Sequence, residues 1–457
     1  MRLAAIVAAG VVLRLDAAAQ WSLHPWDERF HALVARNLAV APLAPTLVPS
    51  DYLDAVASDW QRAHVWLHKP PLALWAMAAS MAAFGVSEVA LRLPSVLASA
   101  IGVYLAFSVG RVTLSENAGL VAAYLYSANA FLVSLAAGRR VADHVDVMLI
   151  VTVQAAMWCL VKLRPVAAGT FCGLALLAKS SPALVVPVVA VVTRRQRSEA
   201  VRWSLLVCGV AAIIAGPWTL FTWLRFPIEA QFEAEYTLRH FTEVLEGHGG
   251  SWLSYFLQMP RHWGEFVYVA LGWFAYGIYR RHEDPGVRVL AAWASVPYLV
   301  FSCAATKLPN MVAIAAPALF AIQAAGWCEL RAYALTARGW KSYGMRIVLV
   351  LALILPVRSL LEPTGPMERR ERHPPRTYEF RELAQHYAAG RAAVFGVPDP
   401  IECMFYSGLA CYSRLPTDGD VQRLRAGTKV LIAAPLSAKW PAWWGATALP
   451  ALASDSH

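Results

Sequence analysis

Long apolar blocks separated by short polar loops dominate the chain. Blocks such as 91–110 and 201–224 come near the roughly 20 residues that a helix needs to cross a bilayer. Counting them predicts about eleven transmembrane helices, near residues 3–20, 91–110, 117–136, 143–161, 165–178, 181–193, 202–224, 264–279, 287–304, 308–328 and 345–361. We therefore expect a polytopic α-helical membrane protein.

Two further segments need a separate interpretation. The block 71–84 is short for a span and begins with proline, so we predict an interfacial helix there. The first block resembles a signal peptide, but Arg14 and Asp16 interrupt it and no convincing cleavage site follows. We expect it to be the retained first span.

Composition and charge support this interpretation. Of the 457 residues, 58% are hydrophobic and only 15% are charged, against about 25% charged in an ordinary soluble domain. This balance excludes a disordered or fully solvated chain. The net charge of +10 could suggest nucleic-acid binding, but the basic residues cluster in short loops between apolar blocks, such as Arg194 to Arg197, Arg280 and Arg281, and Arg331 to Lys341. Cationic loops of this kind stay on the cytoplasmic side, so we attribute the excess to membrane topology and expect no nucleic-acid partner.

With a cytoplasmic N-terminus, every basic loop falls inside and the longer loops fall outside. We expect a membrane domain over 1–361, with a first outer loop at about 21–90 and another at about 225–263. A proline-rich linker then leads to a small extracytoplasmic α/β domain, 362–457. In that domain we predict helices at 381–389 and 421–426, and strands at 392–397, 403–407 and 430–434. Cys403 and Cys411 could form a disulfide there or stay free thiols.

An acidic pair, Asp27 and Glu28, follows the first expected span. A carboxylate there could take a proton from an acceptor hydroxyl or hold a metal ion. The pair could equally cap a helix over 29–39, because Asp is a good N-cap and Glu suits a first turn. Taken alone, the capping role is favoured.

A second polar segment, 138–146, lies at the mouth of an apolar helix. Asp143 and Asp146 are three residues apart and share a helical face. In one interpretation Asp143 caps the helix and pairs with Arg139 or Arg140. In the other, the two arginines grip a phosphate while a carboxylate positions the acceptor or a cation. The residues alone do not favour either of these two interpretations.

Three lysines, Lys69, Lys179 and Lys307, each lie at the outer end of an apolar segment and shortly before a proline. One such lysine would usually extend to the lipid headgroups, but three together with the arginines would suit a lipid phosphate or pyrophosphate. Histidines add further candidates on the same side: His64 and His68 could chelate a metal if that segment were helical, and His240 lies in the later outer loop. For His64 and His68, a hydrogen-bonded pair is favoured over a metal site.

Several segments together resemble a known family. They are Trp26 to Leu38 (WDERFHALVARNL), Trp66 to Leu72 (WLHKPPL), Phe84 to Glu88 (FGVSE), Leu91 to Ser95 (LRLPS), Gly173 to Pro182 (GLALLAKSSP), and Lys307 to Pro309 with Ala316 to Leu319. In this order, over about residues 1–330, they resemble glycosyltransferase family 39 and its relatives of the GT-C fold. These include the aminoarabinose transferases of lipid A and the protein O-mannosyltransferases.

The resemblance implies a bacterial inner-membrane enzyme that works on the periplasmic side. Its donor would be a sugar on a polyprenyl phosphate, and its acceptor a lipid, glycan or protein. Asp27 would match the acidic residue of the first outer loop, the candidate base, and the second-loop acid would fall on Asp143 or Asp146. Lys69, Lys179 and Lys307 would match family lysines. The family often has an acid where this chain has His68. The resemblance therefore leaves open whether a divalent cation is a cofactor.

These residues would suit an inverting transfer, because cations can stabilise the charge that grows on a leaving phosphate. Two other classes are not excluded by the sequence: a transporter, or a polyprenyl-lipid-binding protein without transferase activity. A transporter would commonly show inverted repeats and polar residues near the middle of the membrane. In this sequence we see no repeat, and the main charges within a span are Arg14 and Asp16, which disfavours a transporter. The sequence does not identify the sugar or the acceptor.

Overall fold

The computed structural model describes residues 1–19, 22–50, 52–139, 144–194, 196–281, 284–363, 365–368, 375–424 and 426–452. The chain divides into two compact units. The helical unit comprises Met1–Ala19, Lys69–Ala73 and Arg92–Glu368, and the mixed unit comprises Gln20–His68, Leu74–Leu91 and Arg369–His457. This division groups most of the first outer loop with the C-terminal segment, whereas the sequence placed that loop in the membrane domain.

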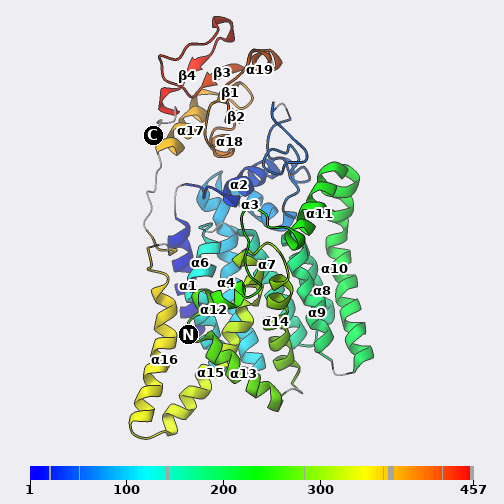
Figure 1. The fold of residues 1–457 in the computed structure, drawn as a ribbon, viewed down its shortest axis with the longest axis vertical. Coiled ribbons are helices and arrows are strands. Elements are labelled where there is room, and N and C mark those ends of the chain that lie inside the picture. Colours follow the sequence, from blue (N-terminus) through cyan, green and yellow to red (C-terminus); the bar gives the residue numbers. More distant parts are fainter. Residues whose placement is uncertain are drawn as a thin grey trace. The chain divides into compact units, whose positions relative to one another are not determined.

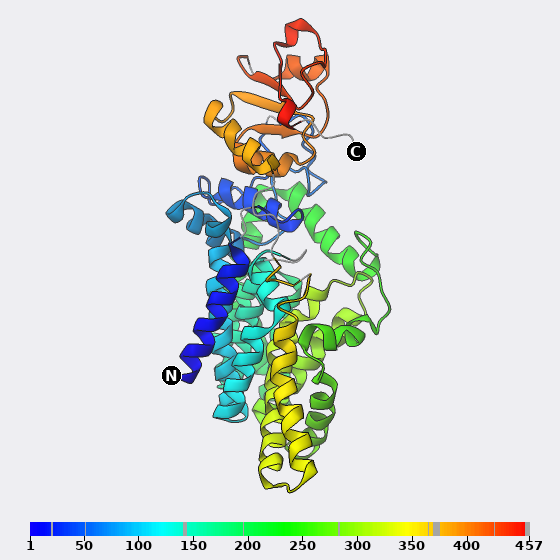
Figure 2. The ribbon, with the colours of Figure 1, turned by 90° about the vertical axis from the view of Figure 1, so that its left-hand side faces the viewer.

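The helical unit is built almost entirely of helices that run side by side (Figures 1 and 2). They are α1 (Arg2–Ala18), α4 (Glu88–Thr113), α5 (Glu116–Ala128), α6 (Ala130–Ala136), α7 (His144–Val161), α8 (Pro165–Ala178), η1 (Ser181–Leu184), α9 (Val185–Val192), α10 (Arg197–Arg225), α11 (Pro227–Thr242), α12 (Ser254–Trp263), α13 (Val267–Arg281), α14 (Pro285–Ser302), η2 (Pro309–Ala315), α15 (Ala316–Thr336) and α16 (Trp340–Arg358).

Each apolar block expected to be a span is helical, which supports a multi-pass membrane protein. Within the described residues, five helices are long and apolar enough to cross a membrane by length and composition: α4, α7, α10, the continuous η2–α15 segment, and α16. A sixth is added if α5 and α6 count as one span, although the chain bends by 58° between them. The number eleven therefore stays a prediction. The block 71–84 is the 14-residue helix α3 (Pro71–Phe84), and its interfacial position also stays a prediction.

The bend between α5 and α6 falls at Asn129. Its side-chain oxygen accepts a hydrogen bond from the Leu132 amide at 3.0 Å, and its Nδ2 donates to the His262 carbonyl at 2.7 Å. Asn129 thus begins a new helix and also binds α12, so the expected span 117–136 is broken by a side chain that satisfies its own backbone.

Arg14, the charge that interrupts the first block, is fully buried. Its guanidinium donates to Ser99 Oγ at 2.7 Å and to three carbonyls, those of Gly10, Tyr126 and Ser127, at 2.9 to 3.2 Å. Because buried charges need several hydrogen bonds to be tolerated, this arginine joins α1 to α4 and α5.

Two glycines allow α8 and α10 to approach closely. A Cβ built on Gly169 would come within 2.7 Å of Val210 Cβ, and one on Gly173 within 2.5 Å of Ile214 Cβ. Small residues serve this purpose in membrane helix pairs, where dispersion contacts between backbones replace the hydrophobic effect.

The mixed unit contains a four-stranded parallel sheet of order β2-β1-β3-β4. Its strands are β1 (Ala392–Phe395), β2 (Ala410–Tyr412), β3 (Lys429–Ile432) and β4 (Thr447–Ala448), and its helices are α2 (Asp27–Leu38), most of α3, α17 (Pro375–His386), α18 (Pro400–Ser407), α19 (Asp418–Arg423), η3 (Ala442–Trp444) and η4 (Pro450–Leu452). The predicted separate domain 362–457 stays a prediction, because here the strands share their unit with most of the first outer loop. The helices predicted at 381–389 and 421–426 lie a few residues earlier.

The predicted strand 403–407 is wrong, because this segment belongs to the helix α18. Pro400 occupies its first turn, and Gly408 ends it with a φ of 74° while its amide donates to the Met404 carbonyl at 2.9 Å. Proline at the start and glycine after the end are helix signals, and they outweigh the short apolar run between them. Cys403 in this helix and Cys411 in β2 form a disulfide.

Charged side chains bind the first outer loop to the C-terminal segment within the mixed unit. Glu88 accepts hydrogen bonds from Arg381 and from Tyr406, both at 2.6 Å. Arg36 of α2 donates to the Met404 and Phe405 carbonyls of α18. A third link is the ion pair between Arg414 and Asp54, at 3.0 Å, and Arg29 pairs with Asp399. The two segments therefore fold as one unit although more than 270 residues separate them.

Candidate functional site

The strongest polar cluster in the helical unit is centred on Asp146, in the first turn of α7. Its side chain is 4% exposed, and Oδ1 lies 2.8 Å from Lys179 Nζ. Its other oxygen, Oδ2, accepts a hydrogen bond from Asn310 Nδ2 at 3.0 Å. The carboxylate thus holds the end of α8, which stops at Ala178, and the start of η2 against α7.

The burial of Asp146 determines what this ion pair needs in order to be stable. Removing two charges from water is costly, and the cost is offset only when geometry is good and the remaining lone pairs are bonded. Asp146 meets both conditions. Lys179 is 22% exposed, so its ammonium reaches the surface of the unit with donors left for another anion.

Helix α11 brings a second group of ionisable residues to the same region. Glu233 and His240 are seven residues apart and therefore lie on one helical face. Burial raises the pKa of Glu233 to about 7, while the charge of Lys69 opposes that rise. Burial lowers the pKa of His240, and the charges of Lys69 and Lys179 lower it further. Both lysines thus act on α11, and Lys179 also pairs with Asp146.

Lys307, expected to bind phosphate, is instead held by backbone. Its Nζ donates to the carbonyls of Phe301, Ser302 and Ala304 at the end of α14. A cation there compensates the unsatisfied carbonyls and the negative end of the helix dipole. Lys307 in this structure therefore stabilises a helix end.

The segment just before Lys307 is tied to the outer loop. The amides of Ala305 and Thr306 donate to the carbonyls of Phe241 and His240, and Lys307 N donates to the His248 carbonyl. These bonds fix the end of α11, and so help to hold His240, beside the loop that leads to Asn310.

In the mixed unit, Asp27 and Glu28 occupy the first turn of α2. The N-cap is Trp26, and no side chain makes a capping hydrogen bond. The expected capping by Asp27 is therefore wrong, because Asp27 is already the first helical residue. Glu28 is fully buried, and its Oε2 accepts the His24 amide at 2.6 Å. Asp27, by contrast, is partly exposed.

His64 and His68 do not form the chelating pair that a helix would have given. The segment from 61 to 70 is not helical. His64 Nδ1 donates to the Val48 carbonyl at 2.6 Å, and the His68 ring stacks on Trp60 with centroids 4.5 Å apart. Across the residues that the structure describes, no group of three or more His, Cys, Asp or Glu side chains is placed to hold a metal ion.

Arg139 is buried and donates to the carbonyls of Gly365, Pro366 and Glu368. These contacts fasten the start of the linker to the helical unit, so we assign Arg139 a structural role. The other two candidates of this segment, Arg140 and Asp143, lie outside the described residues.

The helical unit thus brings together Lys69, Asp146, Lys179 and His240 from the candidates. Sequence reasoning missed Asn310, the second partner of Asp146, and did not single out Glu233 among the acids of its loop. Asn310 follows the Lys-Leu-Pro motif directly, so its place in that motif was the available signal.

Comparisons with known proteins show that the chain is similar to membrane glycosyltransferases. The family model for dolichyl-phosphate-mannose-protein mannosyltransferase matches residues 68–221. The crystal structure of ArnT from Cupriavidus metallidurans bound to undecaprenyl phosphate matches with a TM-score of 0.64 at 16% identity, covering 89% of this chain and 85% of that one. The Archaeoglobus fulgidus oligosaccharyltransferase matches with a TM-score of 0.61 at 12% identity, covering 92% of this chain and 65% of that one. The chain therefore has the GT-C fold.

Within that class, the chain is similar to one kind of protein. Its curated relatives are undecaprenyl phosphate-alpha-4-amino-4-deoxy-L-arabinose arabinosyl transferases. The one from Pseudomonas fluorescens is 23% identical over 56% of this chain and 48% of its own length, and the one from Edwardsiella ictaluri is 26% identical over 56% and 50%. These findings confirm the resemblance seen in the sequence. The chain spans about half the length of these curated relatives.

Proposed function

We propose that this protein is an inverting glycosyltransferase that moves a sugar from a polyprenyl-phosphate donor to an acceptor lipid, glycan or protein. The observation that carries the proposal is the cluster of Lys69 and Lys179 with Asp146 and Asn310, in a chain with the GT-C fold. The relatives' names suggest undecaprenyl phosphate as the carrier and 4-amino-4-deoxy-L-arabinose as the first sugar to test.

The two lysines would bind and activate the leaving group. When the bond between the anomeric carbon and the phosphate oxygen breaks, negative charge grows on that oxygen. Lys69 and Lys179 would stabilise this charge in the transition state more than in the ground state, which is the condition for acceleration. Asp146 and Asn310 would position Lys179, because they fix its Nζ through a buried carboxylate.

Asp27 is our candidate for the general base. Its carboxylate would take the proton from the acceptor hydroxyl or amine as that atom attacks the anomeric carbon. The new bond forms on the face opposite the phosphate, so polyprenyl phosphate leaves and the sugar inverts. Three features support this choice: Asp27 is partly exposed, it has no capping role, and it falls in a family motif.

We place the reaction on the periplasmic face of a bacterial inner membrane. The distribution of basic loops supports this topology, since it puts the loops with Asp27, Lys69 and α11 outside. The disulfide between Cys403 and Cys411 supports an oxidising compartment for the mixed unit.

The test is transfer by the purified full chain in liposomes containing undecaprenyl-phosphate aminoarabinose, with candidate acceptors supplied in turn. Asp27→Asn should lower the transfer rate at least 1000-fold, with the thermal midpoint unchanged. Asp59→Asn, at an acid of the same loop that pairs with the exposed Arg62, should retain activity. Full activity in Asp27→Asn would refute the assignment of the base.

A second measurement separates a transferase from a lipid-binding protein. Native mass spectrometry of Asp27→Asn, extracted gently from its membranes, should show a bound polyprenyl phosphate that carries a sugar mass. If wild-type protein keeps that sugar with every acceptor tried, the chain binds the lipid without transferring from it.

A further inference from the structure

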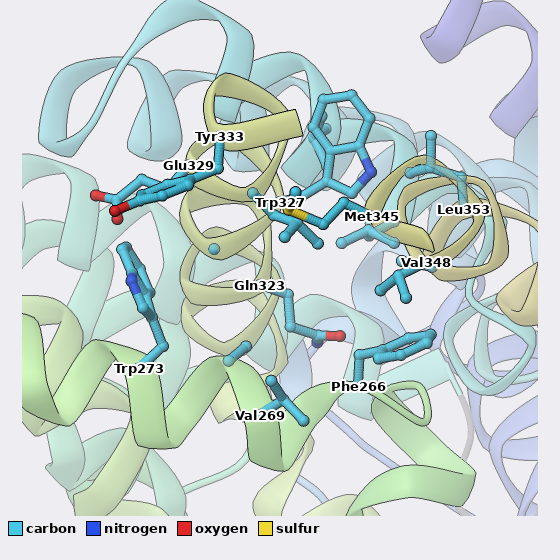
Figure 3. Close-up of a pocket in the computed structure, with 16 residues that line it drawn as sticks. Phe266, Val269, Trp273, Gln323, Trp327, Glu329, Tyr333, Met345, Val348 and Leu353 are labelled. Carbon is cyan, nitrogen blue, oxygen red and sulfur yellow. The ribbon is translucent and has the colours of Figure 1, made fainter. Parts of the chain in front are cut away.

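A crevice of about 400 Å³ lies between three helices of the helical unit, away from the polar cluster described above (Figure 3). Residues of α13, α15 and α16 line most of it, and Val121 and Leu125 of α5 complete the wall. In Figure 3, Val269 and Trp273 project from α13, Phe266 lies just before that helix, and Met345, Val348 and Leu353 project from α16. The wall is almost wholly apolar.

This crevice needs an occupant from the membrane. The outer surface of α16 is exposed and apolar, with Ile347 and Ile354 more than half exposed, so lipid chains are its neighbours. Walls that face an unfilled space lose their dispersion contacts, and an apolar space excludes water. A space of about 400 Å³ is large enough for a stretch of one acyl chain.

The charges at one end of the crevice select the kind of lipid. Residues 329–346 contain a single acid, Glu329, and four basic residues, Arg331, Arg338, Lys341 and Arg346, all exposed. Two of these basic residues directly follow residues of the crevice wall: Arg331 follows Leu330, and Arg346 follows Met345. Such juxtamembrane basic groups attract anionic lipid headgroups.

Exposed aromatic side chains indicate where the basic end of the crevice lies relative to the membrane surface. Tyr333, Trp340 and Tyr343 are each more than two-thirds exposed and surround the turn between α15 and α16. Exposed Trp and Tyr gather at the level of the headgroups, so the basic end of the crevice lies at a membrane surface.

We propose that this crevice binds one acyl chain of an anionic glycerophospholipid, whose headgroup lies among Arg331, Arg338, Lys341 and Arg346. The lipid supports α16, which otherwise packs through only one side. Within the described structure, the α15–α16 contact includes a hydrogen bond from Trp327 Nε1 to the Leu349 carbonyl at 3.0 Å. This inference does not depend on the transferase activity.

Two wall positions allow the crevice to be filled. A Cβ on Gly326 would meet Trp273 at 3.6 Å and Ala270 at 3.9 Å, which are ordinary contacts, so a larger side chain there extends into the space. Ala352 lies on the opposite wall. Gly326→Leu and Ala352→Phe should each occupy the crevice, and one serves if the other fails to fold.

The experiment is native mass spectrometry of the full chain, titrated in detergent with phosphatidylglycerol or phosphatidylcholine of equal chain length. Wild type should retain one phosphatidylglycerol at least fivefold more strongly than phosphatidylcholine. Gly326→Leu and Ala352→Phe should each lose that lipid, and Arg338→Gln/Lys341→Gln should lose the headgroup preference. Ile354→Phe, on the outer surface of α16, and Arg197→Gln/Arg202→Gln, in another basic loop, are the matched controls and should behave as wild type.

Three results would overturn the proposal. One is equal retention of both lipids by wild type, another is unchanged phosphatidylglycerol binding in both filling variants. The third is displacement of the bound phosphatidylglycerol from wild type by equimolar undecaprenyl phosphate, which would assign the crevice to the donor tail.

Discussion

At the scale of single residues, the buried pair of Asp146 and Lys179 combines two tasks. The carboxylate bonds both Lys179 and Asn310, so three chain segments depend on it. Breaking a buried ion pair costs about 3 to 5 kcal/mol, because the remaining charge is left without a partner. The contribution of this pair to stability can therefore be separated from its proposed role in phosphate binding by comparing a variant that lacks one charge with a variant that lacks both.

We predict that Asp146→Asn lowers the free energy of unfolding by about 3 kcal/mol and abolishes transfer. The double variant Asp146→Asn/Lys179→Gln should recover most of the thermal midpoint, since no charge is stranded, yet stay inactive. Melting curves with and without undecaprenyl phosphate test both parts. Recovery of activity in the double variant would show that Lys179 takes no part in the reaction.

Glu233 gives a pH dependence. Its pKa is raised to about 7, so the carboxyl becomes neutral as the pH falls from 8 to 6. Losing that negative charge makes the surroundings of Lys69 more positive. Undecaprenyl phosphate should then bind about fivefold more tightly, equivalent to about 1 kcal/mol of repulsion removed.

The measurement is donor-lipid affinity at pH 6, 7 and 8 for wild type, Glu233→Gln and Glu235→Gln. The first variant should show a weaker pH dependence than wild type, since the titration of the lipid phosphate and of His240 is common to all three. Glu235 is exposed on the same helix and hydrogen-bonded to Gln231, so its variant should follow wild type. Identical pH profiles in all three proteins would exclude a role for Glu233.

At the scale of elements, the glycines of α8 and α10 show how the same residue type serves opposite purposes. Gly173 lies where α10 comes too close for any Cβ, whereas Gly209 and Gly216 of α10 have nothing within 4 Å of a Cβ position. Glycine is essential to packing at the first position and only weakens the helix at the other two.

Gly173→Ala should therefore destabilise the protein by about 1 to 3 kcal/mol, because a methyl group must displace Ile214. Gly209→Ala should have the opposite sign, with up to about 1 kcal/mol of stabilisation from helix propensity. Thermal unfolding in one detergent compares them. A loss of stability in both would mean that α8 and α10 do not pack as described.

At the scale of the whole molecule, the mixed unit depends on segments from both ends of the chain. Glu88 is 5% exposed and is held by Arg381 and Tyr406 from beyond the membrane helices. Deleting the C-terminal segment would remove these two partners of the carboxylate, together with the contacts that this segment makes to the first outer loop. Long-range contacts of this kind make the loop that carries Asp27 dependent on a distant segment.

We predict that Arg381→Met exposes the first outer loop to limited proteolysis and lowers transfer, although Arg381 is not proposed to touch the substrate. Arg391→Met, an exposed arginine of the same unit, is the control and should be cleaved like wild type. If the loop of Arg381→Met is cleaved no faster than that of wild type, the ion pair does not hold it.

The sequence by itself determined the helical membrane fold, the positions of the apolar helices and the resemblance to GT-C glycosyltransferases. Hydrophobic length and the 3.6-residue period are local properties, so each block could be assigned without its neighbours. The motifs that carry Asp27, Lys69, Lys179 and Lys307 were visible for the same reason.

Only the tertiary structure decided what each candidate side chain does. Lys179 meets a carboxylate from α7, whereas Lys307 meets the carbonyls of α14, and nothing in the similar surroundings of the two lysines in the sequence distinguishes them. Arg139 binds the linker, and the first outer loop binds the C-terminal segment, through contacts more than 200 residues apart. Partners at such distances depend on how the helices pack, which a local pattern does not contain.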